Sequence, residues 1–209
     1  MAIPRLIARQ LGRPSGWFGR YVMGRFLNRK TAAHNEVVRQ ELAVAPGDRV
    51  LEVGFGGAAL LERLSAEVSH GHVVGVEISD EMLALGTKRL REPIAAGRVV
   101  LRRGSVEALP CGDGEFDKAC TVNTTYFWPD LAAGLSELRR VLRPGGRLVV
   151  GFVSPDDIVR DGLHRHGFAR HSAEELTLAL RAASFSVGRL RSGSDSRGTF
   201  HVLAAERAG

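Results

Sequence analysis

The segment VLEVGFGGA at residues 50–58 decides the fold, because an apolar strand pattern changes there into a glycine-rich turn. RVLEV at 49–53 has the composition of a buried strand, and Leu60, Leu61 and Leu64 follow at helical spacing. The glycines at 54, 56 and 57 let the backbone turn sharply and leave no side chains between main-chain N–H groups and a ligand. Strand, turn and helix predict the first unit of a parallel α/β sheet that can hold a nucleotide-like ligand.

Outward from this segment, short strand patterns keep alternating with helical periodicity, as βαβ units require. Further strands are expected at 72–78, 99–103, 116–122, 147–153, 185–190 and 199–206. The connection at 192–198 is too short for a helical crossover, so the last two strands are expected to be antiparallel. The sequence therefore predicts a Rossmann-like, doubly wound, mostly parallel seven-stranded sheet with a C-terminal antiparallel hairpin. We expect residues 45–209 to form this domain and residues 1–44 to form an N-terminal helical extension.

The composition of the 209 residues, 44% hydrophobic and 25% charged, is typical of one globular domain and excludes a disordered tail protein. No run approaches the roughly 18 apolar residues that span a bilayer, and no secretory signal pattern is present, so a cytoplasmic location is expected. The two cysteines, Cys111 and Cys120, cannot form a disulfide framework and are expected to be buried. No Cys or His cluster has the spacing of a zinc site, so no metal is expected.

Two carboxylates follow the first two strand patterns, and their positions distinguish between ligand classes. Glu52 lies just before the glycines, where it would repel a pyrophosphate and favour a cationic group. Glu77 closes the second strand, where a carboxylate can accept hydrogen bonds from both hydroxyls of a ribose. The turn is thus predicted to receive a nucleoside that carries positive charge.

With these residues the chain resembles the class I S-adenosylmethionine-dependent methyltransferases, particularly the bacterial small-molecule and lipid methyltransferases. Three further motifs in the family order support the resemblance: GSVEALP at 104–110, EFDKACTVN at 115–123 and LRRVLRPGGRLVV at 138–150. It implies S-adenosylmethionine as cofactor, S-adenosylhomocysteine as product, and methyl transfer to a small molecule by in-line displacement. The cofactor-binding residues that the resemblance implies are Glu52, Gly54, Phe55, Gly56, Glu77, Ile78, Ser105, Val106 and Asn123.

Two positions depart from the family pattern. Ala58 stands where the family has the third glycine of its turn, and Gly57 can offset this change by loosening the turn. Ser105 stands where the family usually has an aspartate that accepts from the adenine amino group. The resemblance therefore implies that the contact with the adenine amino group is either weaker here or made by another group.

The methyl acceptor is expected near TVNTTYFWPDL at 121–131, because ligands bind at the carboxyl edge of such sheets. Tyr126, Phe127 and Trp128 either face this acceptor or only pack the helix that follows. A sulfonium is a good leaving group, so positioning and water exclusion can suffice, and a general base is needed only for a protonated acceptor. The candidate bases are His34 and Tyr126, with His164 and His166 as further candidates.

The basic residues are concentrated near the N-terminus: residues 1–50 have nine basic and three acidic side chains, whereas the remainder has twenty of each. The first thirty residues form a basic amphipathic pattern, which favours a lid over the cofactor cleft and leaves contact with an anionic membrane or lipid as an alternative.

A nicotinamide-dependent oxidoreductase, a nucleic-acid-modifying methyltransferase and a non-catalytic partner protein remain as alternative functions. The neutral main domain argues against nucleic acid.

Overall fold

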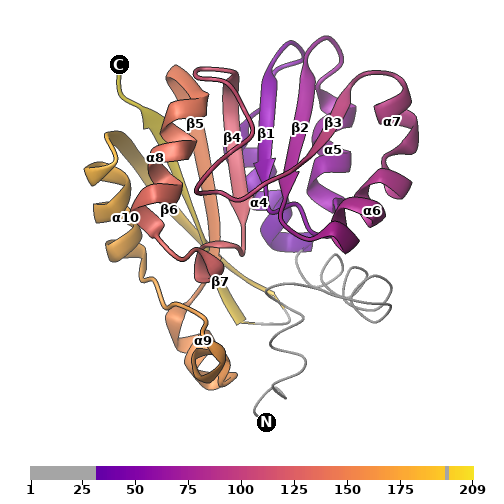
Figure 1. Cartoon of the computed structure of the whole chain (residues 1–209). Coiled ribbons are helices and arrows are strands. Elements are labelled where there is room, and N and C mark those ends of the chain that lie inside the picture. Colours follow the sequence, from indigo (N-terminus) through magenta and orange to yellow (C-terminus); the bar gives the residue numbers. More distant parts are fainter. Residues whose placement is uncertain (1–31, 196–197) are drawn as a thin grey trace.

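A computed structural model describes residues 32–195 and 198–209 of the chain. Its centre is one seven-stranded sheet in the order β3-β2-β1-β4-β5-β7-β6 (Figure 1). The strands are β1 (Arg49–Val53), β2 (His72–Glu77), β3 (Val99–Arg103), β4 (Phe116–Val122), β5 (Leu142–Val153), β6 (Phe185–Asp195) and β7 (Gly198–Arg207). The strands β1 to β5 are parallel to one another, and β7 pairs antiparallel with both β5 and β6. The predicted mixed sheet with an antiparallel hairpin at one edge is confirmed.

Helices cover both faces of this sheet, so each face has its own apolar core. On one face α8 (Leu131–Val141) and α10 (Ala173–Ala182) pack against the strands. The other face is covered by α4 (Ala32–Leu42), α5 (Ala59–Glu67) and α6 (Asp80–Arg89). The short helices α7 (Arg91–Ala95), α9 (Pro155–Arg160), η2 (Thr125–Phe127) and η3 (Leu163–His166) complete the described elements. Strands buried on both faces explain the near-continuous apolar patterns of β1 and β2.

Local signals in the sequence explain where several helices begin. Ser79 caps α6 by accepting from the backbone N–H of Met82, and Asp130 caps α8 by accepting from Ala132 and Ala133. Ser172 and Glu175 form the predicted capping box of α10. At α5 the cap residue is Ala58, which has a left-handed φ of 57° and no side-chain hydrogen bond. A glycine would adopt this conformation at lower cost, which gives a physical reason for the family's preference.

The structure differs from the sequence expectations at four places. One is β5, which begins at Leu142 and not at residue 147. Residues 1–31 of the expected extension lie outside the described residues, but α4 packs on the sheet, with Val38 and Leu42 fully buried. This helix is therefore part of the domain core. The hairpin strands are longer than expected and pair as far as Asp195 and Gly198. Finally, Cys120 is buried as expected, whereas Cys111 is only half-buried.

Candidate active site

The carboxyl ends of β1, β2 and β4 surround a cavity of about 320 Å³. Cavities in this size range hold small ligands, and this edge is where open α/β sheets bind them. The structure brings eleven of the predicted site residues to the cavity wall: Glu52, Gly54, Phe55, Gly56, Glu77, Ile78, Ser105, Val106, Asn123, Phe127 and Trp128. Residues from four segments far apart in the sequence thus meet around one space.

Two glycines shape the turn between β1 and α5, each for its own reason. Gly54 has a φ of 73°, and a Cβ atom there would collide with the side chain of Thr124. Gly56 has a φ of 49°, but a Cβ atom there would meet nothing within 4 Å. Because Gly56 lines the cavity, a side chain at this position would occupy free space beside the turn. The turn therefore keeps room for a ligand against its main chain.

Phe55 lines the cavity, but its ring packs in the core between β2 and α6. A Cβ atom on Gly75 of β2 would lie 2.7 Å from this ring, and one on Gly86 of α6 would lie 2.8 Å from it. The ring therefore fills the space that these two glycines leave between strand and helix, and only 5% of the residue is exposed. Phe55 positions the turn by packing, which sequence reasoning did not anticipate.

Glu52 is 4% exposed and lies at the base of the cavity. Burial, together with the nearby charge of Glu77, raises the pKa of its carboxyl group to about 8. A hydrogen bond from the backbone of Leu61, in the first turn of α5, acts in the opposite direction and helps to cap this helix. The second carboxyl oxygen, Oε2, is buried and has no hydrogen-bond partner among the described residues. Such a group is suited to receive a cationic ligand atom.

Glu77 is held in place by the backbone around it. Its Oε2 accepts from the N–H of Gly56 at 3.0 Å, and its Oε1 accepts from Ile78 and Ser79 at 2.9 and 3.0 Å. Burial raises the pKa of this carboxyl group in spite of these hydrogen bonds. The carboxylate therefore joins the end of β2 to the glycine turn of β1, in an orientation that can also receive ribose hydroxyls.

At the predicted adenine end, Ile78 is 43% exposed and Val106 is buried in the cavity wall. The hydroxyl of Ser105 accepts a long hydrogen bond of 3.4 Å from the backbone N–H of Glu107. Its own hydrogen stays available as a donor, in contrast to an aspartate at this position. Ile78 and Val106 therefore present apolar surface beside the hydroxyl group of Ser105 at this end of the cavity.

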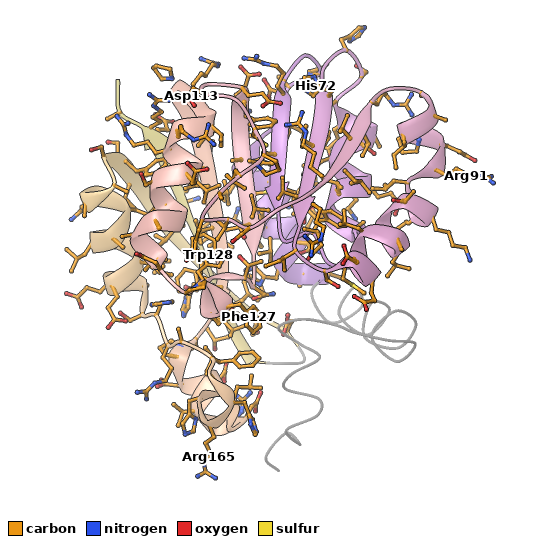
Figure 2. All side chains as sticks on the ribbon, in the orientation of Figure 1. His72, Arg91, Asp113, Phe127, Trp128 and Arg165 are labelled. Carbon is orange, nitrogen blue, oxygen red and sulfur yellow. The ribbon has the colours of Figure 1, made fainter. Side chains whose placement is uncertain are left out.

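At the end of β4, the three predicted aromatic residues have different places. Phe127 lines the cavity and meets Phe168 edge to face, with ring centroids 4.6 Å apart. Trp128 lines the cavity and also packs on Gly134 of α8, so its packing on the following helix is confirmed and its contact with the acceptor stays a prediction. Figure 2 shows Phe127 and Trp128 at the end of the sheet where the cavity opens. Tyr126 is 6% exposed and is not part of the wall.

The structure does not support the candidate bases. His34 is fully buried in α4, where its ring stacks on Phe200 at 4.5 Å and its Nε2 lies 3.3 Å from the carbonyl oxygen of His201. Neither His34 nor Tyr126 contacts the cavity, and His164 and His166 of η3 do not line it either. A histidine packed in the core cannot reach a ligand, so the interpretation of His34 as a base is corrected to a structural role.

Among the other wall residues, sequence reasoning assigned no site role to Asn35, Met82, Glu107, Thr124 and Pro129. Asn35 is the neighbour of His34 on α4. The sequence analysis assigned this helix to the N-terminal extension and did not place it at the cavity. Thr124 lies beside Gly54 across the turn. Glu107 accepts from the backbone N–H of Asp130 and so joins the loop after β3 to the start of α8. These contacts depend on the tertiary arrangement, which local spacing does not reveal.

No group of three or more histidine, cysteine, aspartate or glutamate side chains within residues 32–195 and 198–209 is arranged to hold a metal ion. Likewise, no helix in that part of the chain is long and apolar enough to cross a membrane.

The sheet is Rossmann-like, with a glycine turn after β1 and a carboxylate at the ends of both β1 and β2. This arrangement is typical of enzymes that bind a nucleoside. Residues 51–150 match the family described as "Methyltransferase domain". The chain belongs to the class I S-adenosylmethionine-dependent methyltransferases. This membership decides against the nicotinamide-dependent oxidoreductase that the glycine turn also allowed.

Relatives among known proteins agree with this family. The chain is 31% identical over 123 residues to the uncharacterized methyltransferase YdaC of Bacillus subtilis. The aligned region covers 57% of this chain and 66% of YdaC. It is 32% identical over 112 residues to the ubiquinone/menaquinone biosynthesis C-methyltransferase UbiE of Geotalea daltonii, covering 53% of this chain and 48% of that protein. The chain thus spans about half to two thirds of the length of these relatives.

Among solved structures, geranyl diphosphate C-methyltransferase from Streptomyces coelicolor, in complex with Mg²⁺, geranyl diphosphate and S-adenosyl-L-homocysteine, has the same fold. The TM-score is 0.75 at 19% identity, over 96% of this chain and 88% of that one.

Proposed function

We propose that this chain transfers the methyl group of S-adenosylmethionine to a small-molecule acceptor by in-line displacement. When bound, the cofactor supplies a sulfonium methyl group, whose carbon forms a bond to the acceptor while the carbon–sulfur bond breaks and its electron pair stays on sulfur. The observation that carries the proposal is the pairing of buried Glu52 and Glu77 beside an open glycine turn. The pairing favours a ligand with both positive charge and ribose hydroxyls.

The residues of the cavity fit this cofactor. The unpartnered Oε2 of Glu52 would accept from the ammonium group of the methionine end, and the free space beside Gly56 would admit its chain. Glu77 would accept from the ribose hydroxyls, while Ile78, Ser105 and Val106 would contact the adenine. Asn123 lies at the other side of the turn, at the end of β4.

Phe127 and Trp128 would line the acceptor side and exclude water from the reacting atoms. The described wall contains no histidine, lysine, cysteine or tyrosine side chain. We therefore favour an acceptor that is nucleophilic without deprotonation by the enzyme. The named relatives support a small molecule, since UbiE is a C-methyltransferase of quinone biosynthesis and another neighbour methylates geranyl diphosphate. A cytoplasmic location stays a prediction, and so does the absence of nucleic acid among the partners.

A thermal shift experiment with S-adenosylhomocysteine and with NAD tests this proposal. A ligand at about one hundred times its dissociation constant stabilises a protein by about 2.7 kcal/mol. For a chain of 209 residues this corresponds to a rise in Tm of about 5 to 10 °C. We expect this rise with S-adenosylhomocysteine and none with NAD at the same concentration. A rise with NAD alone would contradict the proposal.

Residues 1–31, which include the basic amphipathic pattern, lie outside the described residues. We propose that they act as a lid on the cofactor cleft. The point where the described chain begins supports this, because Asn35, close to that start, already lines the cavity. Recruitment to an anionic membrane or to a lipid acceptor is the alternative.

Deletion of residues 1–30 separates these two roles. If the segment is a lid, the deletion should speed the dissociation of S-adenosylhomocysteine by about tenfold, measured by stopped-flow displacement. The full chain with Arg13, Arg20 and Arg29 changed to glutamine serves as a control, because it keeps the apolar face and removes charge. Unchanged dissociation in the deletion variant, together with lost binding to anionic vesicles in both variants, would favour recruitment.

A further inference from the structure

Asn123 directly follows β4 and has an uncommon backbone conformation. Its φ is 58°, in the left-handed region, and its backbone N–H donates to the carbonyl oxygen of Gly151 on β5 at 2.8 Å. Asparagine, aspartate and glycine adopt this region more readily than other residues. The conformation turns the chain out of the sheet beside the glycine turn and leaves Asn123 in the cavity wall.

Tyr126 fixes which way the amide group of Asn123 faces. The hydroxyl oxygen of Tyr126 accepts from the backbone N–H of Val153 at 2.6 Å. Its own hydrogen donates to Oδ1 of Asn123 at 2.9 Å. A backbone N–H can only donate, so the hydroxyl group uses its hydrogen on the oxygen end of the amide. The nitrogen end, Nδ2, is thereby directed away from Tyr126.

This Nδ2 atom is buried and has no hydrogen-bond partner among the described residues. A buried donor without a partner is uncommon in native proteins and calls for a ligand or a water molecule. Asn123 itself lines the cavity, so this donor belongs to a residue that a ligand in the cavity would contact. Inside such a dry site a hydrogen bond is stronger than in water.

The order of the strands places this donor on the acceptor side of the cavity. Glu77 on β2 marks the ribose position, the turn after β1 comes next, and β4 follows on the far side. Phe127 and Trp128, four and five residues after Asn123, complete that side of the wall (Figure 2). A molecule that approaches the methyl group from there would meet two aromatic rings and one N–H donor.

We propose that Nδ2 of Asn123 donates a hydrogen bond to an oxygen atom of the methyl acceptor, and that Tyr126 is the positioning residue that keeps this donor in place. The inference rests on the proposed function and narrows it, and it moves Asn123 from the cofactor-binding residues that the resemblance implies to the acceptor side of the cavity. The acceptor class is a planar, largely apolar molecule with a carbonyl or oxyanion oxygen beside the atom that receives the methyl group. Tyr126, which was a candidate base, acts here through Asn123.

The test uses the full chain saturated with S-adenosylhomocysteine and the coloured probe 4-nitrophenolate, with nitrobenzene as the probe that lacks the oxyanion. Asn123→Asp keeps the shape, the left-handed backbone and the bond from Tyr126, but replaces the N–H donor with an acceptor. We expect it to weaken 4-nitrophenolate binding by about tenfold or more, as the loss of a charge-assisted hydrogen bond predicts. Nitrobenzene binding and the dissociation constant of S-adenosylhomocysteine should change by less than about threefold.

Two further variants keep the proposal testable if Asn123→Asp is poorly folded. Asn123→Gly suits the same backbone conformation and should cause a similar loss of 4-nitrophenolate affinity. Tyr126→Phe should cause a smaller loss of that affinity. Binding should shift the absorption band of the phenolate, and this shift should be smaller in Tyr126→Phe. Failure of 4-nitrophenolate to bind the wild-type complex would overturn the inference, as would unchanged binding in Asn123→Asp. A parallel loss of S-adenosylhomocysteine affinity would also overturn it, because Asn123 would then serve the cofactor. If S-adenosylhomocysteine fails to bind the wild-type chain, the proposed function fails instead.

Discussion

Replacing Glu77 with alanine is expected to abolish the stabilisation of this protein by S-adenosylhomocysteine. The carboxylate would accept from two ribose hydroxyls, and hydrogen bonds to charged groups contribute about 1.5 to 3 kcal/mol each. Their loss weakens binding by at least about one hundredfold. At a concentration that raises the Tm of the wild-type chain by about 5 to 10 °C, the variant should then shift by about 1 °C or less.

The same substitution also removes the acceptor for the backbone N–H groups of Gly56, Ile78 and Ser79. The baseline Tm of Glu77→Ala should therefore fall even without ligand, because buried donors lose their partner. Glu77→Gln retains an acceptor oxygen and should keep more of the baseline stability while still losing most of the ligand response. Asp80→Asn, at an exposed carboxylate on the next helix, is the matched control and should respond like the wild type. A full response in Glu77→Ala would refute the ribose assignment.

The parts of the fold that sequence could predict are those with local causes. The apolar strand of β1 and the glycines after it are consecutive in the chain, and so are Ser172 and Glu175 of the capping box. The connection between β6 and β7 is short enough to force an antiparallel pair. Glu52 and Glu77 were found because each stands where a strand pattern ends. In these cases, position relative to an element already limits what the side chain can reach.

The parts that sequence could not predict depend on contacts across the fold. His34 and Asn35 are neighbours on α4, yet one packs on Phe200 in the core and the other faces the cavity. That difference is set by how α4 lies on the sheet. The role of Tyr126 likewise depends on Val153, which is 27 residues away and comes close only through the pairing of β4 with β5.

Replacing Glu52 with glutamine is expected to stabilise the ligand-free protein at pH 8. The carboxyl group has a pKa of about 8 in the folded chain, against an ordinary value of 4.5. The folded state therefore binds more protons at Glu52 than the unfolded state between these values, so the contribution of this group to the free energy of unfolding is largest below about pH 4.5 and falls as pH rises toward 8. The total change from this one group amounts to as much as about 5 kcal/mol. Glutamine keeps an acceptor for Leu61 and has no charge to desolvate.

Urea denaturation of wild type and Glu52→Gln between pH 5 and pH 8.5 measures this difference. The wild-type midpoint should fall over this range, whereas that of the variant should fall much less, and the two should differ most at the alkaline end. Glu62→Gln, at an exposed carboxylate that pairs with Arg89 on the outside of α5, is the matched control and should follow the wild type. Parallel midpoints for wild type and Glu52→Gln would show that Glu52 does not carry the predicted proton.

Burial of the Glu52 carboxylate lowers the free energy of unfolding, and we expect a bound cationic ligand to offset this loss. Calorimetry of S-adenosylhomocysteine binding in buffers of different ionisation enthalpy should detect the release of up to one proton per site at pH 7, because the ammonium group of the ligand favours ionised Glu52. Glu52→Gln should abolish this release and weaken binding by about tenfold or more, although the variant is the more stable protein. A more stable variant with unchanged affinity would make Glu52 only a cap for α5, and the cationic end of the ligand would then have to bind elsewhere in the cavity.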